Sequence, residues 1–169
     1  MLKLAYTYRD KLNSLYQNIV FDNKYKYYNC VDYWGYEIKL NEDSYLDISM
    51  VSVDEEDNVR GFLRASIDRV TNKVSALAVI NFHNANVVFA KDLYQFLKEL
   101  FEKFNFYKIE FSVVVGNPIE KMYDKYIQKY GGQIIGTFRL TTRLQDGELA
   151  DMKYYEIFRD EYLKYIKTK

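Results

Sequence analysis

Residues 112–138 read SVVVGNPIEKMYDKYIQKYGGQIIGTF and contain the only proline of the chain, Pro118, between an apolar run and a series of tyrosines. The apolar run stops at Gly116–Asn117, as expected of a buried strand that ends in a turn. Because proline is favoured in the first turn of a helix, the sequence predicts a helix from Pro118 onward. Gly131–Gly132 predict where that helix ends.

On the N-terminal side of this stretch, apolar residues recur at helical spacing from Val87. They predict a second helix with one apolar face, formed by Leu93, Phe96, Leu97, Leu100, Phe101 and Phe104. The β-branched segment 107–116 then predicts a central strand. Further elements are predicted on the C-terminal side: two strands over 133–147 and 148–158 that turn at Asp146–Gly147, and a short helix over 159–169.

The N-terminal half predicts a strand over 2–8 and a helix over 9–20, with Leu12, Leu15, Tyr16 and Ile19 on one face. Three alternating segments, 45–54, 59–68 and 73–82, predict an antiparallel meander. A helix connects the third of these strands to the strand over 107–116. Such a crossover makes the two strands parallel.

The predicted fold class is therefore α/β (α+β), a mixed sheet with an antiparallel meander and a parallel central pair, flanked by helices. No linker, repeat or low-complexity tract interrupts the sequence, so residues 1–169 are expected to form a single domain.

Composition argues against several classes of protein. The 24 basic and 24 acidic residues cancel, so no nucleic-acid-binding patch is predicted. The apolar runs are far shorter than the ~20 residues of a membrane span, and no signal segment follows Met1, so a cytoplasmic protein is expected. Cys30 and His83 are the only Cys and His, so neither a disulfide nor a Cys/His metal site is predicted.

The run N-P-I-E-K-M-Y-D-K, followed by G-G, by I-I-G and by a late D-G turn, resembles the GNAT superfamily of N-acetyltransferases. The hairpin VSVDEEDNVRGFL, with Gly61 after its turn, also resembles that family. The resemblance implies that acetyl-CoA lies between the two parallel strands, with its pyrophosphate at the start of the helix from Val87. It further implies direct attack, in a ternary complex, by an unidentified primary amine of a small molecule or peptide; assembly as a homodimer stays open.

Five residues fall at positions of the family's site. The resemblance implies that Tyr123 donates a proton to the departing CoA thiolate and that Asn117 binds the pantetheine arm. Val88, Phe89 and Ala90 align with positions of the family's phosphate-binding loop. Two of these residues also have structural explanations, because Tyr123 shares a face with apolar residues and Asn is a preferred helix cap. His83 falls near the same loop, where a solvated side chain is the alternative.

The phosphate-binding loop itself departs from the family pattern. That pattern is R/Q-x-x-G-x-G/A, whereas residues 85–90 read ANVVFA, in which only Ala90 fits. Glycines in such a loop let the backbone approach phosphate closely. A catalytically silent GNAT-fold binding domain is therefore the alternative function. A ligand-binding α+β protein unrelated to acyl transfer is a third.

The general base and the acceptor site are less defined by the sequence. Glu110, Asp68 and Asp47 are candidate bases, and each also suits an ion pair at the surface. A tyrosine-rich tract suits either an aromatic wall for an amine or a cover over the sheet. Its aromatic residues are Tyr25, Tyr27, Tyr28, Tyr33, Trp34 and Tyr36.

Overall fold

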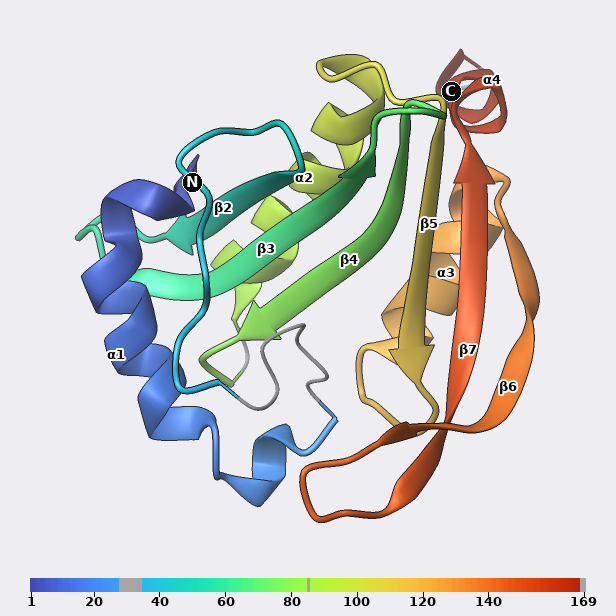
Figure 1. Cartoon of the computed structure of the whole chain (residues 1–169). Helices are drawn as coiled ribbons and strands as arrows, with labels where there is room; N and C mark the ends of the chain where they lie inside the picture. Colours follow the sequence, from blue (N-terminus) through green and yellow to red (C-terminus); the bar gives the residue numbers. More distant parts are fainter. Residues whose placement is uncertain (28–34, 85, 168–169) are drawn as a thin grey trace.

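The computed structural model describes residues 1–27, 35–84 and 86–167, which form one seven-stranded sheet with helices on both faces (Figure 1). The strand order is β1-β2-β3-β4-β5-β7-β6. The strands are β1 (Leu2–Leu4), β2 (Asp47–Val53), β3 (Val59–Asp68), β4 (Lys73–Asn81), β5 (Lys108–Val114), β6 (Gln133–Arg143) and β7 (Leu149–Phe158). The helices are α1 (Arg9–Ile19), α2 (Val87–Glu102), α3 (Glu120–Tyr130) and α4 (Arg159–Lys167), with 3-10 turns η1 (Ala5–Tyr8) and η2 (Asn23–Tyr25).

Pairing in the sheet is antiparallel except between β4 and β5, which are parallel as predicted. The parallel pairing consists of two residue pairs, Lys73 with Lys108 and Val74 with Ile109. Beyond them β4 and β5 diverge, which Figure 1 shows as a widening gap between the two arrows. The predicted mixed sheet, with its meander and parallel central pair, is therefore confirmed.

Helix α2 follows from its apolar spacing and its cap. The side chain of Asn86 accepts a hydrogen bond of 3.0 Å from the N–H of Phe89, which is the usual role of an N-cap residue. The inner face of α2 is buried against the sheet, and each large apolar side chain buried in this way contributes about 1.5–3 kcal/mol. Its buried apolar residues are Phe89, Leu93, Phe96, Leu97, Leu100 and Phe101.

Several predicted boundaries are wrong, among them the end of β6, which is at Arg143 and not at residue 147. Helix α3 begins at Glu120, not at Pro118, because Asn117 first forms a turn: its side chain accepts from the N–H of Ile119 (3.1 Å) and its carbonyl from the N–H of Glu120 (2.9 Å). The first strand ends at Leu4, and the predicted remainder is the 3-10 turn η1. The end of α3 is as predicted, since Gly131 adopts a left-handed φ of 78°.

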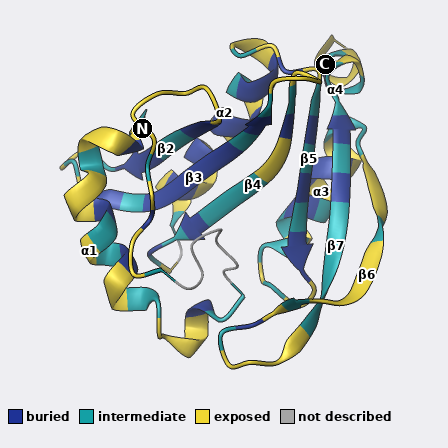
Figure 2. Cartoon of the chain, in the orientation of Figure 1, coloured by how far each residue is buried: buried dark blue, intermediate teal, exposed yellow. Residues whose placement is uncertain are grey.

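The two faces of the sheet are covered unequally. Helices α2 and α3 lie behind it in Figure 1 and enclose the larger apolar core. Helix α1 packs with η1 against β2, β3 and β4 and encloses a smaller core that includes Leu12, Tyr16, Val51 and Phe62. Among the described residues, no helix covers the front of β5, β7 and β6, and β6 is largely exposed in Figure 2.

Strand β6 is an edge strand with interrupted pairing. Its register with β7 shifts between Ile134 and Gly136 and again between Phe138 and Thr142. Leu140, within the second interruption, has a φ of 51°. At the turn, Gly147 has a φ of 89° and donates to the carbonyl of Leu144, so the predicted Asp146–Gly147 turn is correct.

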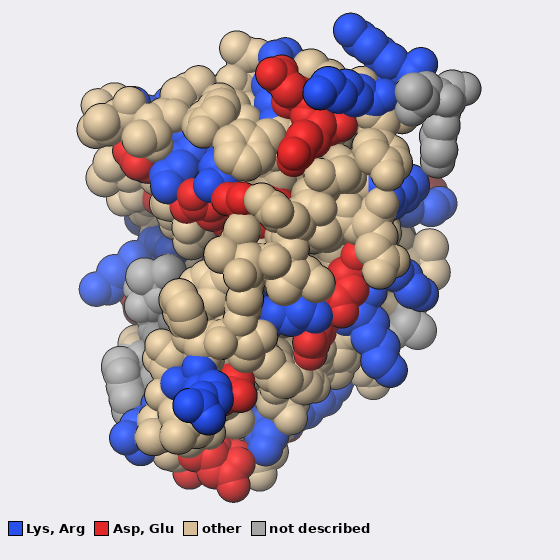
Figure 3. All heavy atoms as spheres, turned by 90° about the vertical axis from the view of Figure 1, so that its right-hand side faces the viewer, with Lys and Arg blue, Asp and Glu red and all other residues tan. Residues whose placement is uncertain are grey.

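Charges of both signs are mixed on one face of the molecule. On the face that carries β6, Lys and Arg side chains lie among Asp and Glu side chains (Figure 3). Within the described part of the chain, no helix has both the length and the apolar character of a membrane span. The described residues also contain no group of three or more His, Cys, Asp or Glu side chains arranged to hold a metal ion.

Candidate functional site

The divergence of β4 and β5 opens a cleft of about 160 Å³. Because the strands pair only at Lys73–Val74 and Lys108–Ile109, the backbone of each is left without a strand partner on the side that faces the cleft. Asn117 and Tyr123, two of the predicted site residues, lie in its wall. The other lining residues are Tyr27, Ser66, Ala76, Leu77, Ala78, Val79, Ile80, Ser112, Val113, Val114, Ile119 and Met152.

A second cavity, of about 360 Å³, lies where α2 and α3 begin. It shares Tyr27, Asn117 and Ile119 with the cleft, so the two spaces adjoin. The predicted residues Phe89 and Ala90 line it, together with Lys24, Tyr25, Asn81, His83, Asn84, Asn86, Leu93, Tyr94, Pro118 and Met122. The site predicted at the carboxyl end of the parallel pair therefore has space for an elongated ligand.

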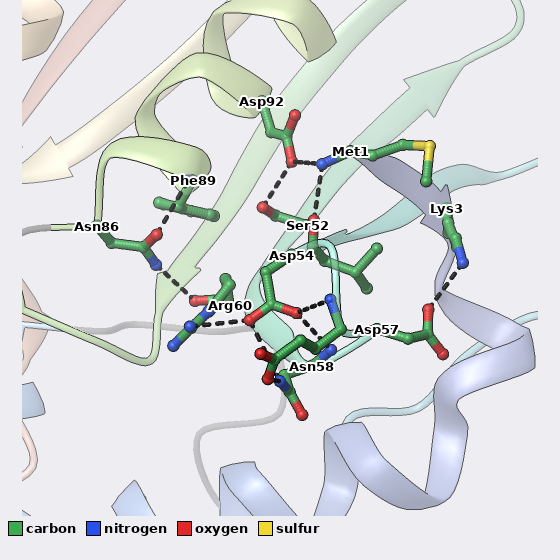
Figure 4. A network of polar contacts seen from close by, with 12 residues as sticks. Met1, Lys3, Ser52, Asp54, Asp57, Asn58, Arg60, Asn86, Phe89 and Asp92 are labelled. Atoms are coloured by element: carbon green, nitrogen blue, oxygen red, sulfur yellow. Dashed lines mark hydrogen bonds and ion pairs between the residues drawn. The ribbon is translucent and has the colours of Figure 1, made fainter.

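Asn86 fixes the start of α2 on the sheet (Figure 4). Its amide nitrogen donates to the carbonyl of Arg60 and to the side chain of Asn81, both at 2.9 Å. Its oxygen accepts from the N–H of Phe89, and its backbone carbonyl accepts from the N–H of Ala90 at 3.0 Å. Of the three residues predicted at the phosphate-binding loop, Phe89 and Ala90 therefore have N–H groups that are already hydrogen-bonded within the chain.

Val88 differs from Phe89 and Ala90. For the N–H groups of Val87 and Val88, the described part of the chain offers no hydrogen-bond acceptor, as is usual in a first helical turn. Both side chains reach solvent, with 65% and 37% of their surface exposed. Ala85, the first residue of the predicted loop, lies outside the described residues.

One turn further along, α2 is tied to the sheet by a buried carboxylate. Asp92 accepts a hydrogen bond of 2.6 Å from the hydroxyl of Ser52 and one of 2.7 Å from the amino group of Met1 (Figure 4). This contact and that of Asn86 hold α2 against β2 and β3 from two points. The wall of the second cavity is therefore rigidly placed.

Asn117 serves the fold and faces the site. Its side-chain oxygen accepts from the N–H of Ile119 and closes a turn before α3, so Asn117 is not the N-cap that the capping explanation predicts; the N-cap is Ile119, which makes no side-chain cap bond. Its side-chain nitrogen has no acceptor among the described residues, and the residue lines both the cleft and the second cavity. A structural role in the turn is compatible with ligand binding, because the side-chain oxygen of Asn117 closes the turn while its side-chain nitrogen is a separate donor.

Tyr123 is likewise both a core residue and a cleft residue. Only 3% of its surface is exposed, and its ring packs edge-on against Phe111 (4.9 Å between centroids) and Tyr155 (6.0 Å). It nevertheless lines the cleft between β4 and β5.

A polar cluster behind Tyr123 is not evident from the sequence. The hydroxyl of Tyr155 donates 2.9 Å to Asp124, and Lys153 pairs with Asp124 at 2.7 Å and with Glu120 at 3.2 Å. Burial, followed by the bond to Asp124, raises the pKa of Tyr155 well above its ordinary value. The only sequence signal is the spacing of Glu120 and Asp124, four residues apart on one helix face.

The three candidate bases all have partners. Glu110 pairs with Lys73 and Lys108, each at 2.8 Å. Asp68 accepts hydrogen bonds from the backbone and hydroxyl of the following turn, and the Ser49 hydroxyl donates to Asp47 at 2.6 Å. Each carboxylate thus has a structural role.

The tyrosine-rich tract reaches the site through its first members. The hydroxyl of buried Tyr25 donates to the carbonyl of Phe82 (3.2 Å), and Tyr27 lines both spaces. Tyr36 is 65% exposed. The half-buried His83 lies in the wall of the second cavity, with Nε2 3.4 Å from the carbonyl of Val59. Four residues named above, Tyr28, Cys30, Tyr33 and Trp34, lie outside the described residues.

Comparison with known proteins identifies the fold. The sequence matches no family model and no curated protein. Among solved structures, the spermidine/spermine N-acetyltransferase SpeG from Vibrio cholerae aligns over 92% of this chain and 77% of its own, with a TM-score of 0.60 and 19% identity. The chain has the GNAT fold.

Other solved structures agree with the GNAT fold. A variant of the same Vibrio cholerae enzyme aligns over 95% of this chain and 78% of its own, with a TM-score of 0.61 and 20% identity. A chimera of that enzyme with hSSAT aligns over 71% and 72% of the two chains, with a TM-score of 0.60 and 20% identity. The likeness at these identities is one of fold.

Proposed function

We propose that residues 1–169 form one acetyltransferase domain, which transfers an acetyl group from acetyl-CoA to a primary amine. The observation that carries the proposal is the cleft between β4 and β5, which holds Tyr123 and Asn117 in its wall. The solved structures with the same fold include spermidine N-acetyltransferases, which supports an amine as the acceptor.

The chain's own groups would act at three points of the transfer. The amine nitrogen attacks the thioester carbonyl directly, and the resulting oxyanion is stabilised by a backbone N–H of β4 that faces the cleft. As the carbon–sulfur bond breaks, the hydroxyl of Tyr123 gives its proton to the departing thiolate. The proton lost by the amine passes to water, since Glu110, Asp68 and Asp47 all have partners within the chain.

Binding of the cofactor would differ from that of a glycine-rich loop. The N–H of Val88, together with that of Val87, would face the pyrophosphate at the positive end of α2. Phe89 and Ala90 would supply the wall of the second cavity, because their N–H groups are paired with Asn86. The side-chain nitrogen of Asn117 would donate to the pantetheine arm.

Thermal unfolding with and without acetyl-CoA tests the proposal. A ligand at 100 times its dissociation constant stabilises the folded state by about 2.7 kcal/mol, so a clear rise in Tm is expected. Release of free thiol in the presence of a panel of primary amines then tests transfer. Absence of a Tm shift at millimolar acetyl-CoA would contradict the proposal. A shift without thiol release for any amine would favour the alternative function, a catalytically silent binding domain.

A further inference from the structure

A third cavity, of about 330 Å³, lies over β5, β7 and β6. Its residues Glu110, Ser112 and Tyr154 alternate along their strands with core residues that pack with α2 and α3, so their side chains lie on the opposite face of the sheet. Ser112 lines both this cavity and the cleft between β4 and β5, so the two spaces adjoin at that residue. The side chains that give the cavity its chemistry are Glu110, Ser112, Ile135, Phe138, Tyr154 and Glu156.

One side of this cavity is aromatic and apolar. The registers pair Ser112 with Tyr154 and bring Phe138 opposite Met152, so alternate residues of three strands face the same way. The rings of Phe138 and Tyr154 lie 4.8 Å apart, and 59% of the surface of Phe138 is exposed. A pair of rings beside a cavity, one of them exposed, offers a face on which a flat apolar group can stack.

The opposite end of the cavity is polar but has no excess charge. Lys108 pairs with Glu110 at 2.8 Å and with Glu156 at 2.5 Å, and Lys73 also pairs with Glu110 at 2.8 Å. Two lysines thus balance two carboxylates. Burial alone would raise the pKa of Glu110, but the hydrogen bonds from Lys108 and Lys73 outweigh it and leave that pKa below its ordinary value.

We infer that this cavity binds the acceptor, and that the acceptor is a primary amine on a single flat apolar body. The inference rests on the proposed function. The apolar body would lie against Phe138 and Tyr154, while the amino group would point past Ser112 into the cleft. A polyamine is disfavoured because each further ammonium would need a carboxylate, and both carboxylates of the cavity are already paired with lysine.

The test compares phenethylamine with spermidine. Direct binding of each amine is measured by calorimetry, and thiol release from acetyl-CoA gives kcat/KM for each. Phe138→Ala removes one ring of the pair, and we expect it to lower the affinity and kcat/KM for phenethylamine by about tenfold. Turnover of ethylamine, which is too small to reach the rings, should change little. Because Phe138 is exposed, the variant is expected to fold, which thermal unfolding checks.

Ile134→Ala is the matched control. Ile134 lies on the same strand with 50% of its surface exposed, but it does not line the cavity. Preferred turnover of spermidine, or equal effects of the two variants, would overturn the inference and leave the acetyltransferase intact. Binding of phenethylamine that depends on Phe138 without any thiol release would instead contradict the proposed function and support the cavity's specificity. Absence of phenethylamine binding would overturn the inference.

Discussion

The ring of Phe89 lies over Gly61, 2.2 Å from the position that a Cβ atom would take there. The carbonyl oxygen of Ile80 lies 2.7 Å from the same position. Gly61→Ala should therefore lower the free energy of unfolding by about 1–3 kcal/mol, as overpacking of a core does. Chemical denaturation of the two proteins measures the difference.

A Phe89→Ala background separates the two contacts at Gly61. In that background Gly61→Ala should lower the free energy of unfolding by less, because the ring is absent. Part of the loss should remain, because the carbonyl oxygen of Ile80 is still close to the added methyl group. Equal costs in both backgrounds would show that the ring does not require the glycine.

Tyr123→Phe tests the proposed proton donor. Loss of general acid catalysis should slow turnover by about 10² or more, while the Tm shift caused by acetyl-CoA persists. Tyr126→Phe is a suitable control, since Tyr126 is buried on the same helix and does not line the cleft. An unchanged rate for Tyr123→Phe would leave Tyr123 with a packing role alone.

Tyr126→Phe should itself stabilise the protein. The hydroxyl of Tyr126 is buried without a hydrogen-bond partner among the described residues, and burial raises its pKa well above the ordinary value. Removing an unsatisfied buried hydroxyl should raise the free energy of unfolding by about 1 kcal/mol. Tyr155→Phe, which removes the bond to Asp124, should have the opposite sign. A destabilised Tyr126→Phe variant would mean that this hydroxyl has a partner in solution.

The pairing of Glu110 predicts a pH dependence of stability. Its pKa is lower in the folded protein, where hydrogen bonds from Lys108 and Lys73 outweigh the effect of burial. The contribution of ionised Glu110 to the free energy of unfolding is therefore complete above its pKa in the unfolded chain, about 4.3. It is lost as the pH falls through the lower pKa of Glu110 in the folded protein. Glu110→Gln should destabilise at pH 7 and have less effect at pH 3.

Glu55→Gln supplies the control for that titration. Glu55 is exposed and forms no ion pair with a described residue, so its substitution should change little at either pH. A Glu110→Gln effect that stays constant from pH 7 to pH 3 would assign the loss to packing and not to charge.

Local patterns were sufficient for much of the fold. The spacing from Leu93 to Phe101 predicts α2 because one face must be buried, and the β-branched run that ends at Gly116 predicts the central strand. The crossover rule then makes β4 and β5 parallel, and the divergence of that pair follows the family resemblance. The start of α3 was missed, because the side chain of Asn117 replaces the first turn that Pro118 suggests.

The site is less accessible to sequence reasoning, because it depends on contacts between distant segments. The position of Asn86 before the predicted helix is a signal for its bond to the N–H of Phe89, but nothing near residue 89 indicates that the Phe89 ring covers Gly61. The cavity beside Phe138 requires the register of β5, β7 and β6, including the shifts in β6. Such registers are set by the assembled sheet and not by any single strand.

The short parallel pairing of β4 and β5 has a mechanical consequence. The sheet consists of two parts, β1 to β4 and β5 to β7, and in the described part of the chain their strands pair only at Lys73–Lys108 and Val74–Ile109, next to a backbone hydrogen bond from Tyr107 to Asn72. A ligand that hydrogen-bonds to both diverging strands would act as an eighth strand and connect the unpaired ends of β4 and β5. Amide hydrogen exchange in the second halves of β4 and β5 should then slow on both sides of the gap at once.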